Sequence, residues 1–214
     1  MDALFKVSAP LLVLILTPAF FLMVLVRYFL VAGSFYSYYH ISKAKTRINR
    51  IVDKTYNYKQ IRQEIKWAIY SSVIFAIVGV AAMMMYHEGS LKIYTGLHDY
   101  GLWYIPVSII LAMIIQETYY YFIHRWMHRP HIYKIMHYVH HASLTPSPWG
   151  AFAFHPLEAF LMAGILPIIL IIVPMHYYAF LAYLIVMTFS SVINHLNIEI
   201  YPKWFRESKL GPWF

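Results

Sequence analysis

Long apolar stretches alternate with polar segments along this chain and predict membrane-crossing helices. Three stretches, 8–31, 67–86 and 102–123, are long enough to cross a hydrocarbon core of about 30 Å as α-helices. Two shorter stretches, 157–174 and 177–193, predict a helical hairpin with a tight turn at residues 174–176. The pattern therefore predicts an all-α integral membrane fold with four to five transmembrane helices.

The composition agrees with a membrane protein. Hydrophobic residues make up 61% of the 214 residues and charged residues 12%, whereas soluble domains are about half apolar and about a quarter charged. The chain has no cysteine, which excludes disulfides, iron–sulfur clusters, thiolate-ligated haem and cysteine-ligated zinc.

The distribution of charge predicts the orientation of the helices. Eight Lys or Arg residues and only two acids lie between residues 34 and 66, and cytoplasmic loops of membrane proteins carry such an excess of positive charge. The segment 87–101 has one Lys and two acids, so we expect it on the opposite side. Counting the helices then places residues 124–156, and the chain from 195 onward, in a cytoplasmic helical cap.

The same reasoning suggests a division of the chain. Residues 1–66 are expected to form an N-terminal membrane helix and a basic cytoplasmic loop, and residues 67–214 a membrane domain. The basic loop is expected to lie near anionic lipid headgroups. It is the only feature that would favour nucleic-acid binding, and we do not expect that function.

Histidines are concentrated in the predicted cap. Six of the twelve histidines of the chain lie between residues 124 and 141. His124 and His128 have the i, i+4 spacing that places two side chains on one face of a helix. His137, His140 and His141 repeat this spacing, with His140 and His141 pointing in different directions. Packing gives no reason for such a cluster, since unsatisfied polar groups are costly to bury, so the spacing predicts a metal site.

Four further residues are candidates for this site. His195 follows the hairpin and can return to the same face. His155 is a ligand, a residue that orients a ligand, or a residue at the start of a helix. Asn197 can hydrogen-bond a ligating imidazole or a bound water, because metal-ligating histidines have oriented partners. Glu117 lies two helical turns before His124, and it either orients an imidazole or pairs elsewhere in the bundle.

The ligand type alone does not identify the metal. Imidazole suits iron, zinc and copper alike, and the sequence lacks the Glu-x-x-His pairs of soluble di-iron bundles. A hydrolytic zinc site needs only about three protein ligands. The surplus of histidines therefore favours two metal ions.

The motifs also resemble a known family. The motifs that carry the resemblance are the His124-x3-His128 box, the His137-x2-His140-His141 box, the stretch from Phe152 to Glu158 that contains His155-Pro156, and the His195-Leu-Asn197 sequence. In combination and order they resemble the fatty acid hydroxylase/sterol desaturase superfamily of integral membrane oxygenases. The resemblance covers roughly residues 67–214.

The resemblance implies a function. It implies two iron ions held only by imidazoles at the cytoplasmic face, with O2 as co-substrate. A lipid C–H bond, in a sterol, a fatty acid or a related lipid, would be hydroxylated or desaturated. Electrons would come from an external donor such as cytochrome b5 or a ferredoxin with its reductase, and the basic loop is a candidate docking site for that donor. The resemblance also implies the endoplasmic reticulum as the location of a eukaryotic member and the inner membrane for a bacterial one.

The sequence departs from the family in one respect. Members carry a third box, His-x2-His-His, shortly after the segment that ends here at Trp213 and Phe214. We therefore expect a chain truncated at its C-terminus that binds metal incompletely and is impaired as an enzyme.

Two functions of other kinds stay open. A membrane zinc hydrolase acting on lipids would need a general base, for which Glu158 or Glu199 is available, but no Gly-x-Ser-x-Gly motif is present. A metal-binding or metal-transporting membrane protein would use the same histidines. Transporters place their ligands near the middle of the membrane, whereas these boxes follow the third predicted helix.

Overall fold

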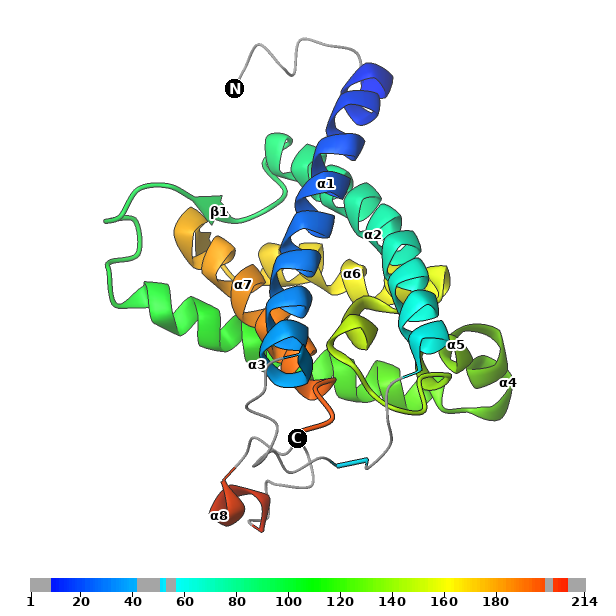
Figure 1. Cartoon of the computed structure of the whole chain (residues 1–214). Helices are drawn as coiled ribbons and strands as arrows, with labels where there is room; N and C mark the ends of the chain where they lie inside the picture. Colours follow the sequence, from blue (N-terminus) through cyan, green and yellow to red (C-terminus); the bar gives the residue numbers. More distant parts are fainter. Residues whose placement is uncertain (1–8, 42–50, 53–56, 199–201, 208–214) are drawn as a thin grey trace.

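A computed structural model describes residues 9–41, 51–52, 57–198 and 202–207. The protein is almost entirely helical (Figure 1). Five helices are long: α1 (Ala9–Tyr36), α2 (Tyr58–His87), α3 (Tyr104–Met127), α6 (Pro156–Ile172) and α7 (Tyr177–Asn194). The short elements are η2 (Ser37–Ile41), β1 (Ile93–Tyr94), α4 (Pro130–Ile132), η4 (Tyr133–His137), α5 (Tyr138–His141), η5 (Pro148–Phe152), β2 (Met175–His176) and α8 (Lys203–Arg206).

Four helices are long and apolar enough to cross a membrane. They cover Pro10–Tyr39, Tyr58–His87, Tyr104–Met127 and Tyr177–Asn194. Helix α6 is also apolar but shorter. These helices confirm the predicted all-α integral membrane fold.

Helix α2 begins earlier than its apolar stretch suggests. Residues 58–66 are rich in Lys, Gln, Arg and Glu, which are good helix formers although they are polar. The Asn57 side chain caps the helix by accepting a hydrogen bond from the Lys59 N–H at 2.9 Å, as N-cap residues do. The division expected after residue 66 therefore falls inside α2, and part of the expected basic loop is helical. Its residues Lys43, Lys45, Arg47, Arg50 and Lys54 lie outside the described residues.

Two histidines are N-cap residues of helices, and their side chains accept hydrogen bonds from backbone N–H groups. Nδ1 of His155 accepts from the Leu157 N–H at 3.3 Å at the start of α6. Nδ1 of His176 accepts from the Tyr178 N–H at 3.2 Å at the start of α7. In α6 the first helical residue is Pro156, whose missing N–H costs nothing at that position.

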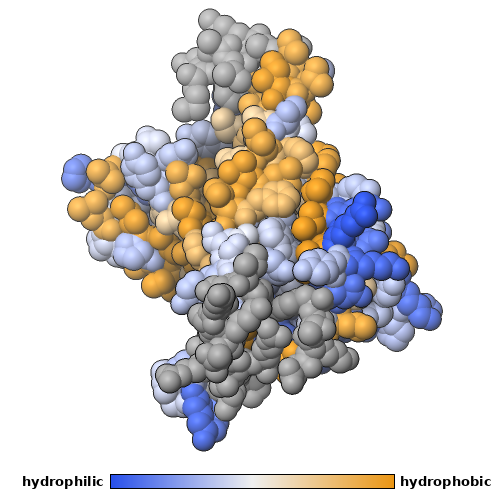
Figure 2. Space-filling model, viewed as in Figure 1, coloured by the Kyte–Doolittle hydropathy of each residue, from blue (hydrophilic) through white to orange (hydrophobic). Residues whose placement is uncertain are grey.

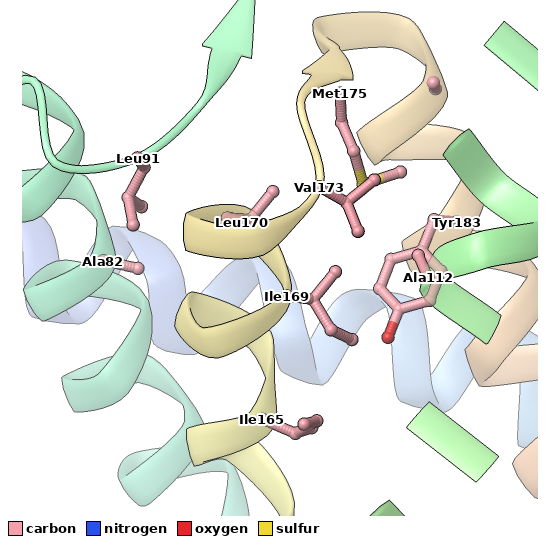
Figure 3. Packing of buried hydrophobic residues seen from close by; sticks show 10 residues of the cluster. Ala82, Leu91, Ala112, Ile165, Ile169, Leu170, Val173, Met175 and Tyr183 are labelled. Atoms are coloured by element: carbon pink, nitrogen blue, oxygen red, sulfur yellow. The ribbon is translucent and has the colours of Figure 1, made fainter. Parts of the chain in front are cut away.

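The hairpin of α6 and α7 packs against α2 and α3 at one end of the molecule. Figure 3 shows Ile165, Ile169 and Leu170 of α6 and Tyr183 of α7 in a buried cluster with Ala82 of α2 and Ala112 of α3. The expected tight turn between these helices contains β2, which pairs in parallel with β1. This pairing was missed, because strands of two residues leave no sequence pattern.

The other ends of the helices converge. Helix α1 contacts α2, and η5 contacts α1, α2 and α7. A second buried cluster lies there, with Tyr28, Ala68, Phe152 and Val192 among its members. In Figure 1, α4 and α5 lie beside the end of α3 in this half of the molecule. Figure 2 shows hydrophilic residues gathered there, whereas hydrophobic residues cover much of the rest of this view.

Candidate metal centre

The first histidine box lies at the C-terminal end of α3. His124 belongs to the last turn of the helix, and His128 is its C-cap residue. Their spacing lets both imidazoles turn to the same side. The two Nε2 atoms are 3.0 Å apart.

The second box follows a π-helical turn. Element η4 ends at His137, and α5 carries His140 and His141. Isolated π turns inside helices are frequent at functional sites. Nε2 of His141 lies 3.0 Å from Nε2 of His137, which is completely buried. The sequence indicated the i, i+4 spacing but not the π turn.

The two boxes form one group of four histidines. His124, His128, His137 and His141 each offer a ring nitrogen, and these four atoms lie within 4.8 Å of one another. The rings of His124 and His137 are 4.7 Å apart between centroids, and those of His128 and His141 are 4.9 Å apart. Nitrogens from both boxes thus face one small volume.

A buried carboxylate orients the central imidazole. Nδ1 of His137 lies 2.8 Å from Oε1 of Glu158, and the Glu158 residue is only 1% exposed. When Nδ1 donates its proton to this carboxylate, the lone pair of Nε2 points into the four-histidine group. Carboxylates commonly orient metal-ligating histidines in this way. The sequence offered Glu158 as a possible general base and not as the partner of His137, because 21 residues separate the two.

The histidines are held in their neutral form. Burial lowers the pKa of His137 to about 4, and it also lowers the pKa values of His128 and His141. Neighbouring histidines lower the last two further, because each disfavours a second positive charge. At neutral pH these imidazoles therefore carry lone pairs that a metal ion can use.

His140 and His195 form a separate pair beside this group. Nε2 of His195 is 3.4 Å from Nε2 of His140. Nδ1 of His195 lies 2.8 Å from the Ser191 carbonyl oxygen, which can only accept. The proton of a neutral His195 therefore sits on Nδ1, and its Nε2 lone pair faces His140. His140 and His141 have ring planes 85° apart, and each lies in a different one of these two groups of histidines.

The donor set fits a metal ion. Metal–imidazole bonds are about 2.0–2.1 Å long, so two such ligands at a right angle place their nitrogens about 3.0 Å apart. This is the Nε2 separation within each box of the four-histidine group. Neutral nitrogens, a shared focus and an oriented central imidazole all favour a divalent metal. Imidazoles alone do not separate iron from zinc.

Other expected site residues lie apart from the four-histidine group. His155 caps α6 and its ring packs 6.1 Å from that of Trp67, so the structure favours its expected role at a helix start. Glu117 is exposed on α3, and its side chain makes no hydrogen bond within the described part of the chain. Its position seven residues before His124 places it about 10 Å away along the helix axis. The expected orientation of an imidazole by Glu117 therefore has no contact to support it.

Asn197 has a different partner from the one expected. Its side-chain oxygen accepts from the Val52 N–H at 2.7 Å, and its side-chain nitrogen donates to the Val52 carbonyl at 2.9 Å. Its backbone has a φ of 56°, a left-handed conformation that Asn tolerates better than most residues. Asn197 thus binds the backbone of Val52, in the segment before α2, and not a histidine. Glu199, considered above as a general base, lies outside the described residues.

Comparisons with known proteins identify relatives of this region. Residues 109–213 match the family model described as fatty acid hydroxylase, and this range contains all of the histidines discussed above as ligands. The chain is 33% identical over 124 residues to the delta(7)-sterol 5(6)-desaturase ERG3B of Gibberella zeae, covering 57% of this chain and 38% of that protein. It is 31% identical over 138 residues to human lathosterol oxidase, covering 64% of this chain and 46% of that protein.

A third relative is the delta(7)-sterol 5(6)-desaturase erg3C of Aspergillus fumigatus, with 36% identity over 104 residues. That match covers 49% of this chain and 32% of the relative. The matches thus span between 32% and 46% of the length of these relatives. No solved structure matches the chain.

Proposed function

The chain belongs to the fatty acid hydroxylase/sterol desaturase superfamily, and from this premise we propose that it is a membrane oxidoreductase that hydroxylates or desaturates a lipid. The observation that carries the proposal is the four-histidine group, in which His124, His128, His137 and His141 point ring nitrogens at one volume. The proposed cofactor is a pair of iron ions, with His140 and His195 holding the second ion beside the first.

The cofactor would supply the activation of O2 that an unactivated C–H bond requires. The residues of the chain supply the rest of the site. Glu158 fixes the ring of His137 through the 2.8 Å contact at Nδ1, and the Ser191 carbonyl fixes the ring of His195. Burial keeps the imidazoles of the second box neutral, so that they bind metal without first losing a proton.

The substrate would come from the bilayer. The described part of the chain has four helices that are long and apolar enough to cross a membrane, and the relatives are named as sterol desaturases and a lathosterol oxidase. We therefore propose a sterol with a Δ7 double bond as the first substrate to test. The product would be the corresponding 5,7-diene, with O2 as the oxidant and two electrons from an external donor.

The proposed donor is a small acidic electron carrier such as cytochrome b5 or a ferredoxin. The described basic residues at the start of α2, Lys59, Arg62 and Lys66, lie at the same end of the molecule as the histidines. This end is proposed to face the cytoplasm, in the endoplasmic reticulum of a eukaryote or the inner membrane of a bacterium. Reversing the three charges should slow reduction by the donor and weaken its dependence on salt.

The first experiment measures metal content. The chain is purified in detergent after growth with iron, and the metals are counted by mass spectrometry for the wild type and for His137→Ala. Iron in the wild type that is lost in His137→Ala supports the proposal. One zinc per chain, with no uptake of iron under anaerobic loading, would instead favour the hydrolase or a metal-handling role.

The second experiment measures the reaction. Membranes that contain the chain are supplied with a Δ7-sterol, O2 and a reducing system, and sterols are analysed by gas chromatography and mass spectrometry. Formation of the 5,7-diene in the wild type but not in His137→Ala supports a desaturase. An oxygenated product without the diene would make the enzyme a hydroxylase. No oxidised lipid from protein that carries two iron ions per chain would refute an oxygenase that acts on this substrate.

A further inference from the structure

A buried acid on α2 is not used by the proposed reaction. Glu64 is 4% exposed and lies in the polar start of the helix, six residues after its first residue. No described Lys or Arg forms an ion pair with it. Its carboxylate is instead surrounded by hydroxyl and amide groups: Oε1 accepts from Gln60 Nε2 at 2.8 Å and from the Ser143 hydroxyl, and Oε2 accepts from the Ser147 hydroxyl.

Gln60 extends this network one turn along the same helix. Its amide nitrogen also lies 3.0 Å from the Ser143 hydroxyl and donates to the Thr145 carbonyl at 2.7 Å. Its amide oxygen accepts from the Thr145 N–H at 3.4 Å. Two side chains of α2 therefore hold four polar groups of the segment 143–147, where Thr145 and Ser147 are buried.

This segment directly follows the second histidine box. Ser143 is two residues after His141, and Ser147 is the N-cap residue of η5. A Cβ atom at Gly150 of η5 would lie 3.5 Å from a ring carbon of His195 and 3.8 Å from the carboxyl carbon of Glu64. Gly150 thus lies between the Glu64 carboxyl group and the ring of His195.

The rest of the connection to α6 is held by other helices. The Tyr28 hydroxyl donates to the Trp149 carbonyl at 2.6 Å, and Ser191 donates to the Ala151 carbonyl at 2.9 Å. Ser71 donates to the Phe154 carbonyl at 3.0 Å. These contacts hold residues 149–154, whereas the segment 143–147 next to the histidine box is held by Glu64 and Gln60.

We propose that Glu64 and Gln60 are positioning residues of the metal centre, which hold the segment 143–147 so that the second box stays in its binding geometry. The inference rests on the proposed metal-binding function. A neutral Gln at position 64 can keep this network without the charge, because its amide oxygen can accept from the Ser143 hydroxyl and its NH2 group can donate to the Ser147 oxygen. A Leu can do neither.

The test titrates the purified 214-residue chain with Co²⁺, whose d–d absorption reports imidazole ligation. Removing groups that orient metal ligands lowers affinity by about 10- to 100-fold in other proteins. We expect Glu64→Leu and the Ser143→Ala/Ser147→Ala double variant each to weaken Co²⁺ binding at least about 10-fold and to change the d–d spectrum. Glu64→Gln should stay within about threefold of the wild type.

The control is Gln63→Ala, which alters an exposed residue next to Glu64 and should change nothing. Circular dichroism verifies that each variant keeps its helices, and the double variant leaves α2 untouched if Glu64→Leu does not fold. Combining Glu64→Leu with the double serine variant should weaken binding no further, since both remove the same contacts.

The outcomes separate this inference from the function on which it rests. Wild-type protein that binds no Co²⁺ would overturn both. Wild-type protein that binds Co²⁺ through His137, together with unchanged affinity and spectrum in folded Glu64→Leu and in the serine variant, would overturn the positioning role alone. A loss in Glu64→Gln equal to that in Glu64→Leu would also overturn it, because the charge and not the network would then be needed.

Discussion

Replacing Glu158 by Gln should weaken metal binding without disturbing the fold. The two side chains have nearly the same volume, which matters because Glu158 is 1% exposed. The amide oxygen of Gln can still accept from Nδ1 of His137, so the 2.8 Å contact can be kept while the ionisable carboxyl group is lost. Burial raises the pKa of Glu158 to about 9, so we expect its negative charge at neutral pH only when a bound metal ion favours it. A hydrogen bond to a charged group is worth about 1.5–3 kcal/mol and a neutral one about 0.5–1.5 kcal/mol. The midpoints of these ranges differ by about 1.3 kcal/mol, which corresponds to roughly an eightfold loss of affinity.

Glu158→Leu should cost more than Glu158→Gln. It leaves the buried Nδ1–H of His137 without an acceptor, which costs a further 1–3 kcal/mol or about 5- to 150-fold in affinity. The assay is competition for Co²⁺ or Fe²⁺ against a chelator of known affinity. Glu207→Gln is the matched control, because it makes the same chemical change at an exposed residue near the end of the described chain.

Equal affinities of the wild type and Glu158→Gln would refute the reasoning. The same would follow if Glu158→Leu bound metal as tightly as Glu158→Gln. In either case the ring of His137 would be held in place by packing, and the carboxylate would serve the stability of the α6 start instead. Thermal unfolding of metal-free Glu158→Gln distinguishes that result, because this variant keeps an acceptor for Nδ1 of His137 and only a structural role of the carboxyl group predicts a loss of stability without metal.

Three further predictions follow from the site and the fold. Affinity for Co²⁺ should change little from pH 8 to pH 6 and fall below about pH 5, because burial lowers the pKa of His137 to about 4 and protons then compete with the metal. A fall in affinity centred near pH 6.5 in a pH titration would contradict this prediction. Ile169→Ala should lower the free energy of unfolding in detergent by about 2 kcal/mol, since Ile169 is fully buried, whereas Phe160→Ala on the exposed side of α6 should have little effect. Asn197→Ala should lower the melting temperature and leave Co²⁺ affinity unchanged, because Asn197 bonds to Val52 and not to a histidine; a selective loss of affinity would restore the role first expected for it.

The helices were predictable because the bilayer constrains them directly. A span must be apolar over its whole length, so the stretches at 8–31, 67–86 and 102–123 appear in the sequence without any alignment. The polar start of α2 was not predicted from the apolar pattern, since helix propensity and an Asn cap extend the helix beyond its apolar part. The two-residue strands β1 and β2 escaped it too, because their pairing depends on which loops the helices bring together.

The candidate site was predictable where its geometry is local. The i, i+4 spacings of His124 with His128 and of His137 with His141 carry over directly into Nε2 separations of 3.0 Å. Contacts between distant segments were harder to predict. Neither the bond of Glu158 to His137 nor that of Asn197 to Val52, 145 residues apart, leaves a local pattern. Glu64 was hidden in the same way, because it looks like an ordinary acid in a basic segment.

The separation of His195 from the other histidines has a consequence for biosynthesis. The four-histidine group is complete in the sequence at residue 141, before α6 and α7 have been made. The partner of His140 emerges from the ribosome only 55 residues after it. We therefore expect the nascent chain to meet the two groups of nitrogens in order, with the first available before the hairpin inserts and the second only after α7 has crossed the membrane. A ribosome stalled between α5 and α7 would expose the first group without the second.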